Sequence, residues 1–536
     1  MNRRDFLKLS ALTTVPVVTG FPEQANASPK SRTAEPKKFR LAETTIADLQ
    51  QAMASGHESS VSICKKYLDR INDLDRRGPK LRAIIELNPD ALTIAHQLDV
   101  ERKEKGPRGP MHGIPVLIKD NIATHDRMST TAGSLALEGS IAPGDAFVAK
   151  RLREAGAVIL GKTNMTEWAN FRGDHSISGW SGRGGQTKNP YVLDRNPSGS
   201  SSGSGTAVSA NLCAVAIGTE TNGSVISPAN VCGIVGIKPT VGLVSRFGII
   251  PISRTQDTAG PMARTVTDAA ILLSAMVGVD SRDDVTTTAA DHIQRDYTKF
   301  LNADGLRGKR IGIARQFFSS ESMGDVLLKK ALETMEQKGA ILVPFKDKIT
   351  NWGHAESVVL HYEFKAGVNE YLAWLGPKAP ARDLAELIAF NDRNKNRELI
   401  YFGQEDFTTS QALGPRTDSA YLEALEKCRR ASRAEGIDAV MKQYNLDAIA
   451  APSGGPADPI DVIYGDRGTG GCSGPAAIAG YPNINVPAAQ YMGLPVGISF
   501  FGKAFSEPTL LAIAYSFEQA TKARFEPQFK PTVESV

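Results

Sequence analysis

Three short segments of the sequence match patterns of residue types that are used in nucleophilic or phosphate chemistry. The first, residues 196–205, reads NPSGSSSGSG, and within it Gly199 to Gly203 match the G-x-S-x-G elbow of α/β-hydrolases. That match would make Ser201 a nucleophile, with a histidine base taken from His292, His354 and His361. An elbow must follow a strand, whereas the preceding YVLDRNP is turn-like. A flexible linker is also disfavoured, because the loop runs directly into the apolar stretch ANLCAVAIG.

The second loop, GTETNGS at residues 218–224, lies between the apolar runs CAVAIG and VCGIVGIKP. A tight turn at Asn222 and Gly223 would leave several backbone N–H groups pointing outward beside the hydroxyl of Ser224. Acyl transfer requires this pairing of a nucleophile with an oxyanion hole. Serine after glycine is also common in ordinary turns, so both interpretations stay open for the loop taken alone.

The third loop candidate, GAVILGKT from Gly156 to Thr163, formally satisfies the nucleotide-binding P-loop pattern. A P-loop needs a backbone-exposing loop after a strand, but residues 157–160 are themselves a continuous apolar run. The sequence therefore predicts a buried strand here and disfavours nucleotide binding at Lys162.

The elements that carry these loops alternate between short apolar runs and helical patterns. The runs GIPVLIKD, AGAVILGKT, ANLCAVAIGTE and NVCGIVGIKPT are typical of an α/β fold. Helical spacing predicts one helix from Ile46 to Met53, ending at Gly56, and another along Leu510, Ile513, Ala514 and Phe517. Residues 280–447 are richer in charge and indicate a helical lobe. With no internal repeat or linker, we expect one domain over residues 44–536.

The N-terminus has the form of a targeting segment. Arg3 and Arg4 precede a short, weakly apolar run and the small-residue site Ala25-Asn26-Ala27. This pattern predicts a twin-arginine signal peptide over residues 1–27, cleaved after Ala27 and followed by a linker over residues 28–43. We therefore expect the export machinery as a partner, a periplasmic or secreted protein, and no stable insertion in the membrane.

Composition excludes several classes of protein. The chain has 536 residues, of which 41% are hydrophobic and 22% charged, which disfavours collagen-like, coiled-coil and disordered proteins. The net charge of +4 implies no broad field for nucleic acid. Five scattered cysteines without a CxxC motif disfavour a disulfide framework, and eight histidines without HExxH predict no metal or other cofactor.

Together, the stretches HGIPVLIKDN, PSGSSSGSG and GTETNGSVISPANVCGIVGIKPT resemble the amidase signature family in order, spacing and content. The similarity extends from about Thr44 to Pro527. Within that family, SGWSGRGGQTKNPY and QDTAGPMAR look most like the bacterial peptide amidases, which hydrolyse the C-terminal carboxamide of peptides to acid and ammonia. The resemblance implies a large mixed, mostly parallel central sheet, covered by helices on both faces.

The resemblance also implies site residues. The family's triad would be Lys119 of GIPVLIKD, a bridging Ser200 in a cis peptide bond, and the nucleophile Ser224. The oxyanion hole would be the backbone N–H groups of Thr221, Asn222, Gly223 and Ser224, and Ser201 would be a supporting hydroxyl. Proximity to the matched motifs suggests substrate contacts at Thr131, Trp168, Asn170 and Trp180.

A lysine base is physically reasonable in this setting. Deprotonating a lysine of ordinary pKa at pH 7 would cost about 4 to 5 kcal/mol. The apolar neighbours Val116, Leu117 and Ile118 disfavour the ammonium form of Lys119 and so reduce that cost. Taken alone, Lys119 beside Asp120 would be interpreted as a solvated or ion-paired lysine, and the two matched serine loops favour the base instead.

Some positions depart from the family's usual pattern. Ser198 stands where glycine is usual, Glu220 replaces the common aspartate, and Asn222 replaces the first of two glycines. Val225 and Ile226 leave no arginine soon after Ser224, which disfavours a small charged substrate such as glutamine. A general acylamide or aryl amide hydrolase remains an alternative. So does the ammonia-supplying subunit of a tRNA-dependent amidotransferase, although the export signal argues against it.

Overall fold

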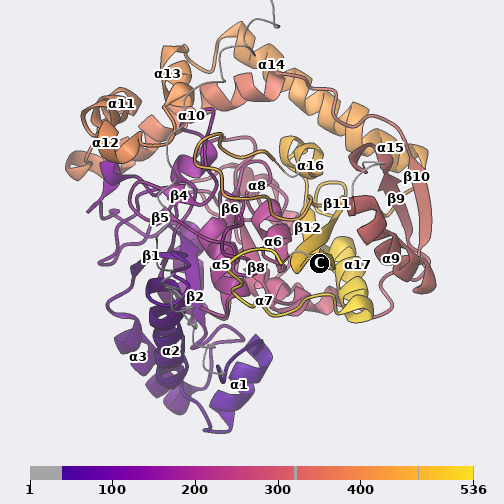
Figure 1. Cartoon of the computed structure of the whole chain (residues 1–536), viewed down its shortest axis with the longest axis horizontal. Coiled ribbons are helices and arrows are strands. Elements are labelled where there is room, and N and C mark those ends of the chain that lie inside the picture. Colours follow the sequence, from indigo (N-terminus) through magenta and orange to yellow (C-terminus); the bar gives the residue numbers. More distant parts are fainter. Residues whose placement is uncertain (1–38, 319–322, 469, 535–536) are drawn as a thin grey trace, which may run out of the picture. The chain divides into compact units, whose positions relative to one another are not determined.

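The structure, a computed structural model, describes residues 39–318, 323–468 and 470–534, and the chain from Phe39 onward forms one compact unit (Figure 1). The predicted signal peptide, residues 1–27, and the linker up to residue 38 lie outside the described residues. Within the described ranges, no helix combines the length and apolar character needed to cross a bilayer.

The described residues contain one large sheet of eleven strands. In spatial order these are β1 (Ile84–Leu87), β3 (Val158–Thr163), β2 (Pro115–Lys119), β6 (Val215–Glu220), β8 (Thr258–Ala263), β7 (Val235–Lys238), β12 (Asn483–Tyr491), β13 (Leu494–Phe501), β11 (Ala448–Pro452), β9 (Arg310–Ala314) and β10 (Ile341–Phe345). A separate small hairpin joins β4 (Trp180–Ser181) to β5 (Gly185–Gln186).

The prediction of a large mixed sheet is confirmed, but the expectation that parallel strands would predominate is wrong. Six of the ten pairings in this sheet are antiparallel, and the four parallel ones are β3–β2, β2–β6, β11–β9 and β9–β10. The antiparallel strands β7, β8 and β13 are buried along their whole length. They therefore read as the continuous apolar runs that are usually typical of parallel strands.

The helices of the described residues are distributed along the whole chain. They are α1 (Ile46–Ala54), α2 (Ser60–Arg70), α3 (Ala91–Lys105), α4 (Phe147–Glu154), α5 (Ser202–Ser209), α6 (Ile226–Val231), α7 (Val266–Met276), α8 (Val285–Thr288), α9 (Met323–Gln337), α10 (Ala355–Leu375), α11 (Leu384–Arg393), α12 (Lys395–Glu398), α13 (Glu405–Ala412), α14 (Ser419–Ser432), α15 (Asp438–Gln443), α16 (Ser473–Ala479) and α17 (Glu507–Thr521). The two helices predicted at Ile46 and at Leu510 are confirmed as α1 and α17.

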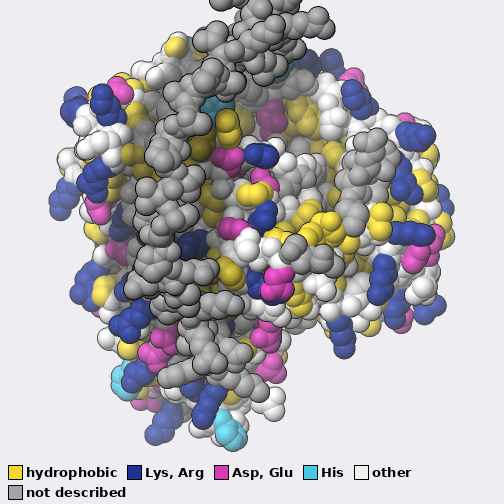
Figure 2. Space-filling view, in the orientation of Figure 1, with side chains coloured by type: hydrophobic (Ala, Val, Ile, Leu, Met, Phe, Trp, Pro, Cys, Tyr) yellow, Lys and Arg dark blue, Asp and Glu magenta, His cyan; other side chains and the backbone are white. Residues whose placement is uncertain are grey.

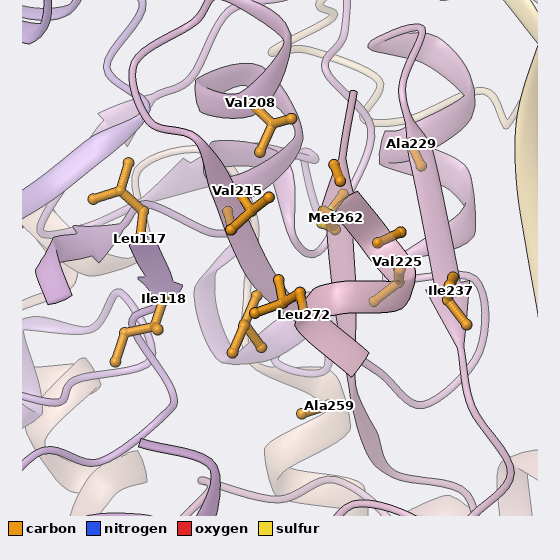
Figure 3. Close-up of a cluster of buried hydrophobic side chains, with 14 of the residues drawn as sticks. Leu117, Ile118, Val208, Val215, Val225, Ala229, Ile237, Ala259, Met262 and Leu272 are labelled. Atoms are coloured by element: carbon orange, nitrogen blue, oxygen red, sulfur yellow. The ribbon is translucent and has the colours of Figure 1, made fainter. Parts of the chain in front are cut away.

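Helices cover both faces of the sheet, as connection rules require. The units β2–α4–β3 and β3–α5–β6 step across the sheet in opposite directions, so right-handed crossovers place α4 and α5 on opposite faces. In agreement, α4 packs against α7, whereas α5 packs against α6. Figure 3 shows the resulting core, in which Leu117 and Ile118 of β2 lie with Val208 of α5 and Leu272 of α7.

The segment expected as a helical lobe, residues 280–447, is mostly helical but also contributes β9 and β10 to the sheet. Its longest helix, α10, packs against α13 and α14, and these helices run along the upper edge of the view in Figure 1. On the face drawn in Figure 2, basic and acidic side chains are interspersed, in keeping with the small net charge.

Candidate active site

The carboxyl ends of β2 and β6 bring the predicted lysine to the serine-rich loop. Lys119 is the last residue of β2 and is fully buried, and Thr219 lies near the end of the neighbouring parallel strand β6. The ammonium nitrogen Nζ of Lys119 lies 2.8 Å from Ser200 Oγ, 3.0 Å from Thr219 Oγ1 and 3.1 Å from the Thr219 carbonyl oxygen. In contrast, Asp120 turns away from Lys119 and accepts hydrogen bonds from Thr131 and Gly133.

Burial changes the acid–base properties of this lysine. The pKa of Lys119 is lowered to about 7, because the desolvated site disfavours the ammonium form, while the nearby carboxylates of Asp257 and Glu220 act in the opposite direction. A substantial fraction of the amine is therefore neutral near pH 7. A neutral amine at 2.8 Å from a hydroxyl can accept its proton.

The serine-rich loop approaches Lys119 in a defined conformation. The peptide bond between Gly199 and Ser200 is cis, and the Ser200 carbonyl accepts a 3.1 Å hydrogen bond from the backbone N–H of Thr166. A Cβ at Gly199 would collide with Thr166 Oγ1 and lie within 3.0 Å of Asn170 and Ser178. Glycine is therefore needed at position 199 for the loop to lie this close to its neighbours.

Ser201 links the serine-rich loop to β6 and to Ser224. Its hydroxyl accepts a hydrogen bond from the Thr219 N–H and donates one to the Thr219 carbonyl, both at 3.1 Å. Its backbone N–H donates to the Ser224 carbonyl at 3.2 Å. The Ser201 hydroxyl therefore has one partner as a hydrogen-bond donor and another as an acceptor, and both belong to Thr219.

Ser224 lies at the turn between β6 and α6, and its side chain is nearly buried. Glu220 Oε2 accepts hydrogen bonds from Val225 N at 2.7 Å and Ile226 N at 3.0 Å, which closes the turn, and Gly223 has a positive φ of 82°. Among the described residues, no hydrogen bond joins the hydroxyls of Ser200 and Ser224. Catalytic hydrogen bonds often shorten only when substrate binds.

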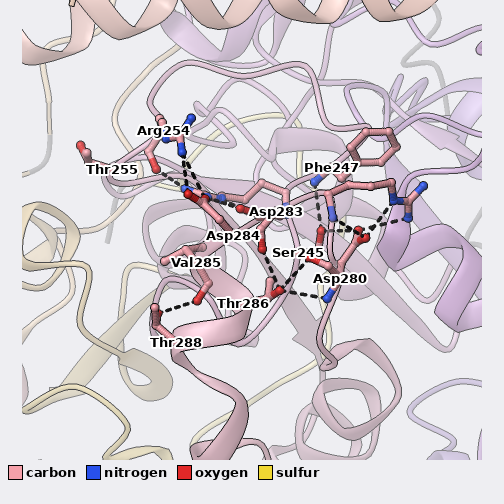
Figure 4. Close-up of polar contacts among 12 residues, drawn as sticks. Ser245, Phe247, Arg254, Thr255, Asp280, Asp283, Asp284, Val285, Thr286 and Thr288 are labelled. Atoms are coloured by element: carbon pink, nitrogen blue, oxygen red, sulfur yellow. Dashed lines mark hydrogen bonds and ion pairs between the residues drawn. The ribbon is translucent and has the colours of Figure 1, made fainter. Parts of the chain in front are cut away.

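A loop before β8 brings a half-buried carboxylate, that of Asp257, to the same edge of the sheet. Asp257 accepts hydrogen bonds from the N–H groups of Ile252 and Ser253, both at 2.8 Å, and from the Thr221 hydroxyl. Figure 4 shows how the loop between β7 and β8 is anchored to the turn before α8, with Ser245 bonded to Asp280 at 2.8 Å and Arg254 paired with Asp284 at 2.9 Å. The anchoring positions Asp257 beside the loop that carries Ser224.

The four suggested substrate contacts lie in different environments. Asn170 is half-buried and donates to Ser176 at 3.0 Å, next to the serine-rich loop. Thr131 donates to Asp120, Trp168 packs against Phe364 and Phe407, and Trp180 packs against Phe402. Asn170 lies beside Gly199, and all four side chains are engaged in contacts within the protein.

The structure bears out the interpretation of the P-loop pattern as a buried strand. Residues 158–163 form β3, and the Lys162 ammonium is buried and donates to the Ile122 carbonyl and, at 2.9 Å, to Thr130. Over the described residues, the structure offers no histidine base for Ser201 as the nucleophile of a G-x-S-x-G elbow. His292 stacks on Phe505, His361 pairs with Ser410, and His354 is exposed at the start of α10, so none of them contacts Ser201.

Several residues of the site were missed by the sequence interpretation. Thr219 and Asp257 lie within the quoted stretches GTETNGS and QDTAGPMAR, so the motifs themselves offered a signal. Glu356 of α10, which contacts Asn222, lies far away in a helical segment that carries no motif. Within the part of the chain that the structure describes, no cluster of three or more His, Cys, Asp or Glu side chains is arranged to hold a metal ion.

Comparison with known proteins agrees with this geometry. The amidase family profile matches residues 62–511. A crystal structure of the peptide amidase from Stenotrophomonas maltophilia is 51% identical, covers 92% of this chain and 99% of its own, and superposes with a TM-score of 0.88.

Curated relatives point to the same family. A probable amidase from Arabidopsis thaliana is 45% identical over 502 residues, which cover 92% of each chain. A glutamyl-tRNA(Gln) amidotransferase subunit from Halorhodospira halophila is 34% identical over 497 residues, which cover 89% of this chain and 97% of that protein. The protein therefore belongs to the amidase signature family.

Proposed function

We propose that this protein is a serine amidohydrolase that cleaves carboxamides to carboxylic acid and ammonia through an acyl-enzyme. The observation that carries the proposal is the buried Lys119, whose Nζ lies 2.8 Å from Ser200 Oγ at the loop tied to Ser224. A buried amine with a lowered pKa, a neighbouring hydroxyl and a second serine that follows a tight turn would supply the parts that acyl transfer requires.

In the proposed reaction, neutral Lys119 accepts the proton of Ser200 while Ser200 accepts that of Ser224. The Ser224 oxygen attacks the amide carbonyl carbon, and the backbone N–H groups of residues 221–224 hold the negative oxygen of the tetrahedral intermediate. The relay then runs in reverse and protonates the departing nitrogen, so that ammonia leaves and an ester to Ser224 remains. Water adds to this ester, which releases the carboxylic acid and restores the Ser224 hydroxyl.

We propose the C-terminal amide of peptides as the substrate. This choice is supported by the similarity to the peptide amidase of Stenotrophomonas maltophilia, which extends over 92% of the chain. The residues after Ser224 also support it, because Val225 and Ile226 provide no cation for the carboxylate of a small charged substrate such as glutamine, and both are buried. The alternatives are a general acylamide or aryl amide hydrolase and a glutamine-using amidotransferase component, to which the chain is also similar.

The test is release of ammonia by the purified protein from a panel of amides. The panel contains amidated peptides, free amino-acid amides, aryl amides and glutamine, each at a matched concentration. The proposal expects kcat/KM for amidated peptides to exceed the values for the other three classes by at least about tenfold. Equal or faster release from aryl amides would support the general hydrolase instead. If glutamine were the sole substrate that releases ammonia, and if this release required added partner proteins, the result would favour the amidotransferase.

We also propose that the protein is exported as a folded chain through the twin-arginine route. The support is the pair Arg3 and Arg4 with the small-residue site ending at Ala27. The five cysteines are all free and buried, which fits a chain that folds in a reducing compartment before export.

A further inference from the structure

The start of helix α10 contacts the loop that carries Ser224. Asn222 Nδ2 donates a 2.7 Å hydrogen bond to Glu356 Oε1, in the first turn of α10. At its other end, Asn222 Oδ1 accepts a 2.8 Å hydrogen bond from Ser473 Oγ, the first residue of α16. The Asn222 side chain is therefore held between two helices that belong to distant parts of the sequence.

Glu356 also holds a second side chain of the site. Gln256 is buried, and its Nε2 donates to Glu356 Oε1 at 3.1 Å and lies 3.4 Å from the Thr221 carbonyl oxygen. One carboxylate oxygen thus accepts two amide donors, one from Asn222 and one from Gln256. With Glu356 removed, both amide groups would lose their common acceptor.

These contacts constrain the direction of a peptide N–H. The Thr221 carbonyl and the Asn222 N–H belong to one planar peptide unit, so a contact that orients the carbonyl also orients the N–H on the opposite side. The hydrogen bonds of the Asn222 side chain to Glu356 and Ser473 also restrain the backbone of Asn222, because the side chain is attached to that backbone. An oxyanion hole depends on donors held in place before the reaction, because a donor that must reorient loses most of its effect.

We propose that Glu356 is a positioning residue that holds the oxyanion hole of the Ser224 loop through Asn222 and Gln256. This role rests on the proposed function, because it assigns the N–H groups of residues 221–224 to the tetrahedral intermediate. The contact also makes α10, a helix without any recognisable motif, part of the support of the reaction centre.

The first test compares Glu356→Ala with Glu356→Gln. Glutamine keeps an acceptor oxygen for Asn222 and Gln256, so Glu356→Gln should stay within about threefold of wild-type kcat, whereas Glu356→Ala should lose about 10- to 100-fold in kcat with KM nearly unchanged. The matched control is Glu370→Ala, which removes a carboxylate from the same helix where it pairs with Arg416 at 2.7 Å. Wild-type kcat in Glu356→Ala would overturn the proposal.

The second test separates positioning from folding. Asn222→Asp places a carboxylate against Glu356 and should lower kcat at least about tenfold by like-charge repulsion. Adding Glu356→Gln should recover most of that loss, because the glutamine amide can donate to the new carboxylate. If the double variant is no faster than Asn222→Asp alone, the coupling between the two residues is absent and the proposal fails.

A fluorophosphonate probe distinguishes failure of this inference from failure of the proposed function. Attack of the Ser224 oxygen on phosphorus expels fluoride and leaves a phosphonate ester, so its rate senses the nucleophile and the hole without depending on amide preference. Wild-type protein that is not labelled at Ser224 would sink the proposed function. Labelling of wild type and Glu356→Ala at equal rates would contradict only the proposed role of Glu356 and would leave the proposed function standing. We expect labelling of Glu356→Ala to slow about as much as kcat.

Discussion

At the residue scale, the proposed chemistry depends on Lys119, whose pKa is lowered by its burial in the fold. Lys119 has no exposed surface, and its polar neighbours are two hydroxyls and a carbonyl rather than a carboxylate in direct contact. Asp257 and Glu220 lie near enough to raise its pKa but do not outweigh the loss of water. The side chain is therefore suited to alternate between amine and ammonium near neutral pH.

This balance predicts the pH dependence of activity. The neutral amine is the active form, so kcat/KM should rise with pH and level off above about 7, the value to which burial lowers the pKa of Lys119. Asp257→Asn removes a negative charge that favours the ammonium form, so the acid limb should move to lower pH. The measurement is ammonia release from one amidated peptide between pH 5 and 9. A rate that is flat over this range would contradict the role of Lys119.

At the element scale, a buried cluster of charged side chains joins the short helix α12 to residues 167–172. Its members are Arg172, Glu167 and Glu398. Arg172 lies 3.1 Å from Glu167 and 3.9 Å from Glu398 at the end of α12, and all three side chains are fully buried. Burial raises the pKa of Glu167 well above its usual range, although Arg172 opposes this and Glu398 adds to it. Arg172 also lies over the Phe402 ring, 4.1 Å from its centroid.

Arg172→Met is expected to lower the free energy of unfolding by about 3 to 5 kcal/mol, because it removes the buried cation between Glu167 and Glu398 together with the hydrogen bond that it donates to the Glu398 carbonyl. Chemical denaturation followed by circular dichroism measures the change. The matched control is Arg382→Met, which breaks an exposed ion pair with Glu386 and should leave the denaturation midpoint unchanged. Equal midpoints for Arg172→Met and wild type would show that the buried cluster does not stabilise the fold.

At the scale of the whole molecule, the chain is an amidase domain preceded by a segment with the form of an export signal. Replacing Arg3 and Arg4 by lysine should retain the protein in the cytoplasm, since the twin-arginine pair is the feature read by the exporter. Cell fractionation with mass spectrometry measures the location and the N-terminus, which should begin at Ser28 in exported protein. Export that is unaffected by the double substitution would contradict the twin-arginine assignment.

The sequence predicted some of these features better than others, for physical reasons. Short local motifs sufficed to propose Lys119, Ser200 and Ser224, and the structure brings Lys119 within 2.8 Å of Ser200, while the role of Ser224 stays a prediction. The direction of strands such as β13 could not be read from the sequence, because a strand buried on both faces is apolar whether its neighbours are parallel or antiparallel. Glu356 was missed because only tertiary packing brings α10 to Asn222.

In the proposed mechanism, Ser224 becomes acylated with help from Lys119 and Ser200. The most direct measurement is intact-protein and peptide mass spectrometry of the chain reacted with the fluorophosphonate probe, alongside ammonia release by Ser224→Ala, Ser201→Ala and wild type. We predict a single label on Ser224 and a loss of at least about a thousandfold in kcat for Ser224→Ala, with a smaller loss for Ser201→Ala. A label on Ser201, or wild-type ammonia release by Ser224→Ala, would contradict the mechanism.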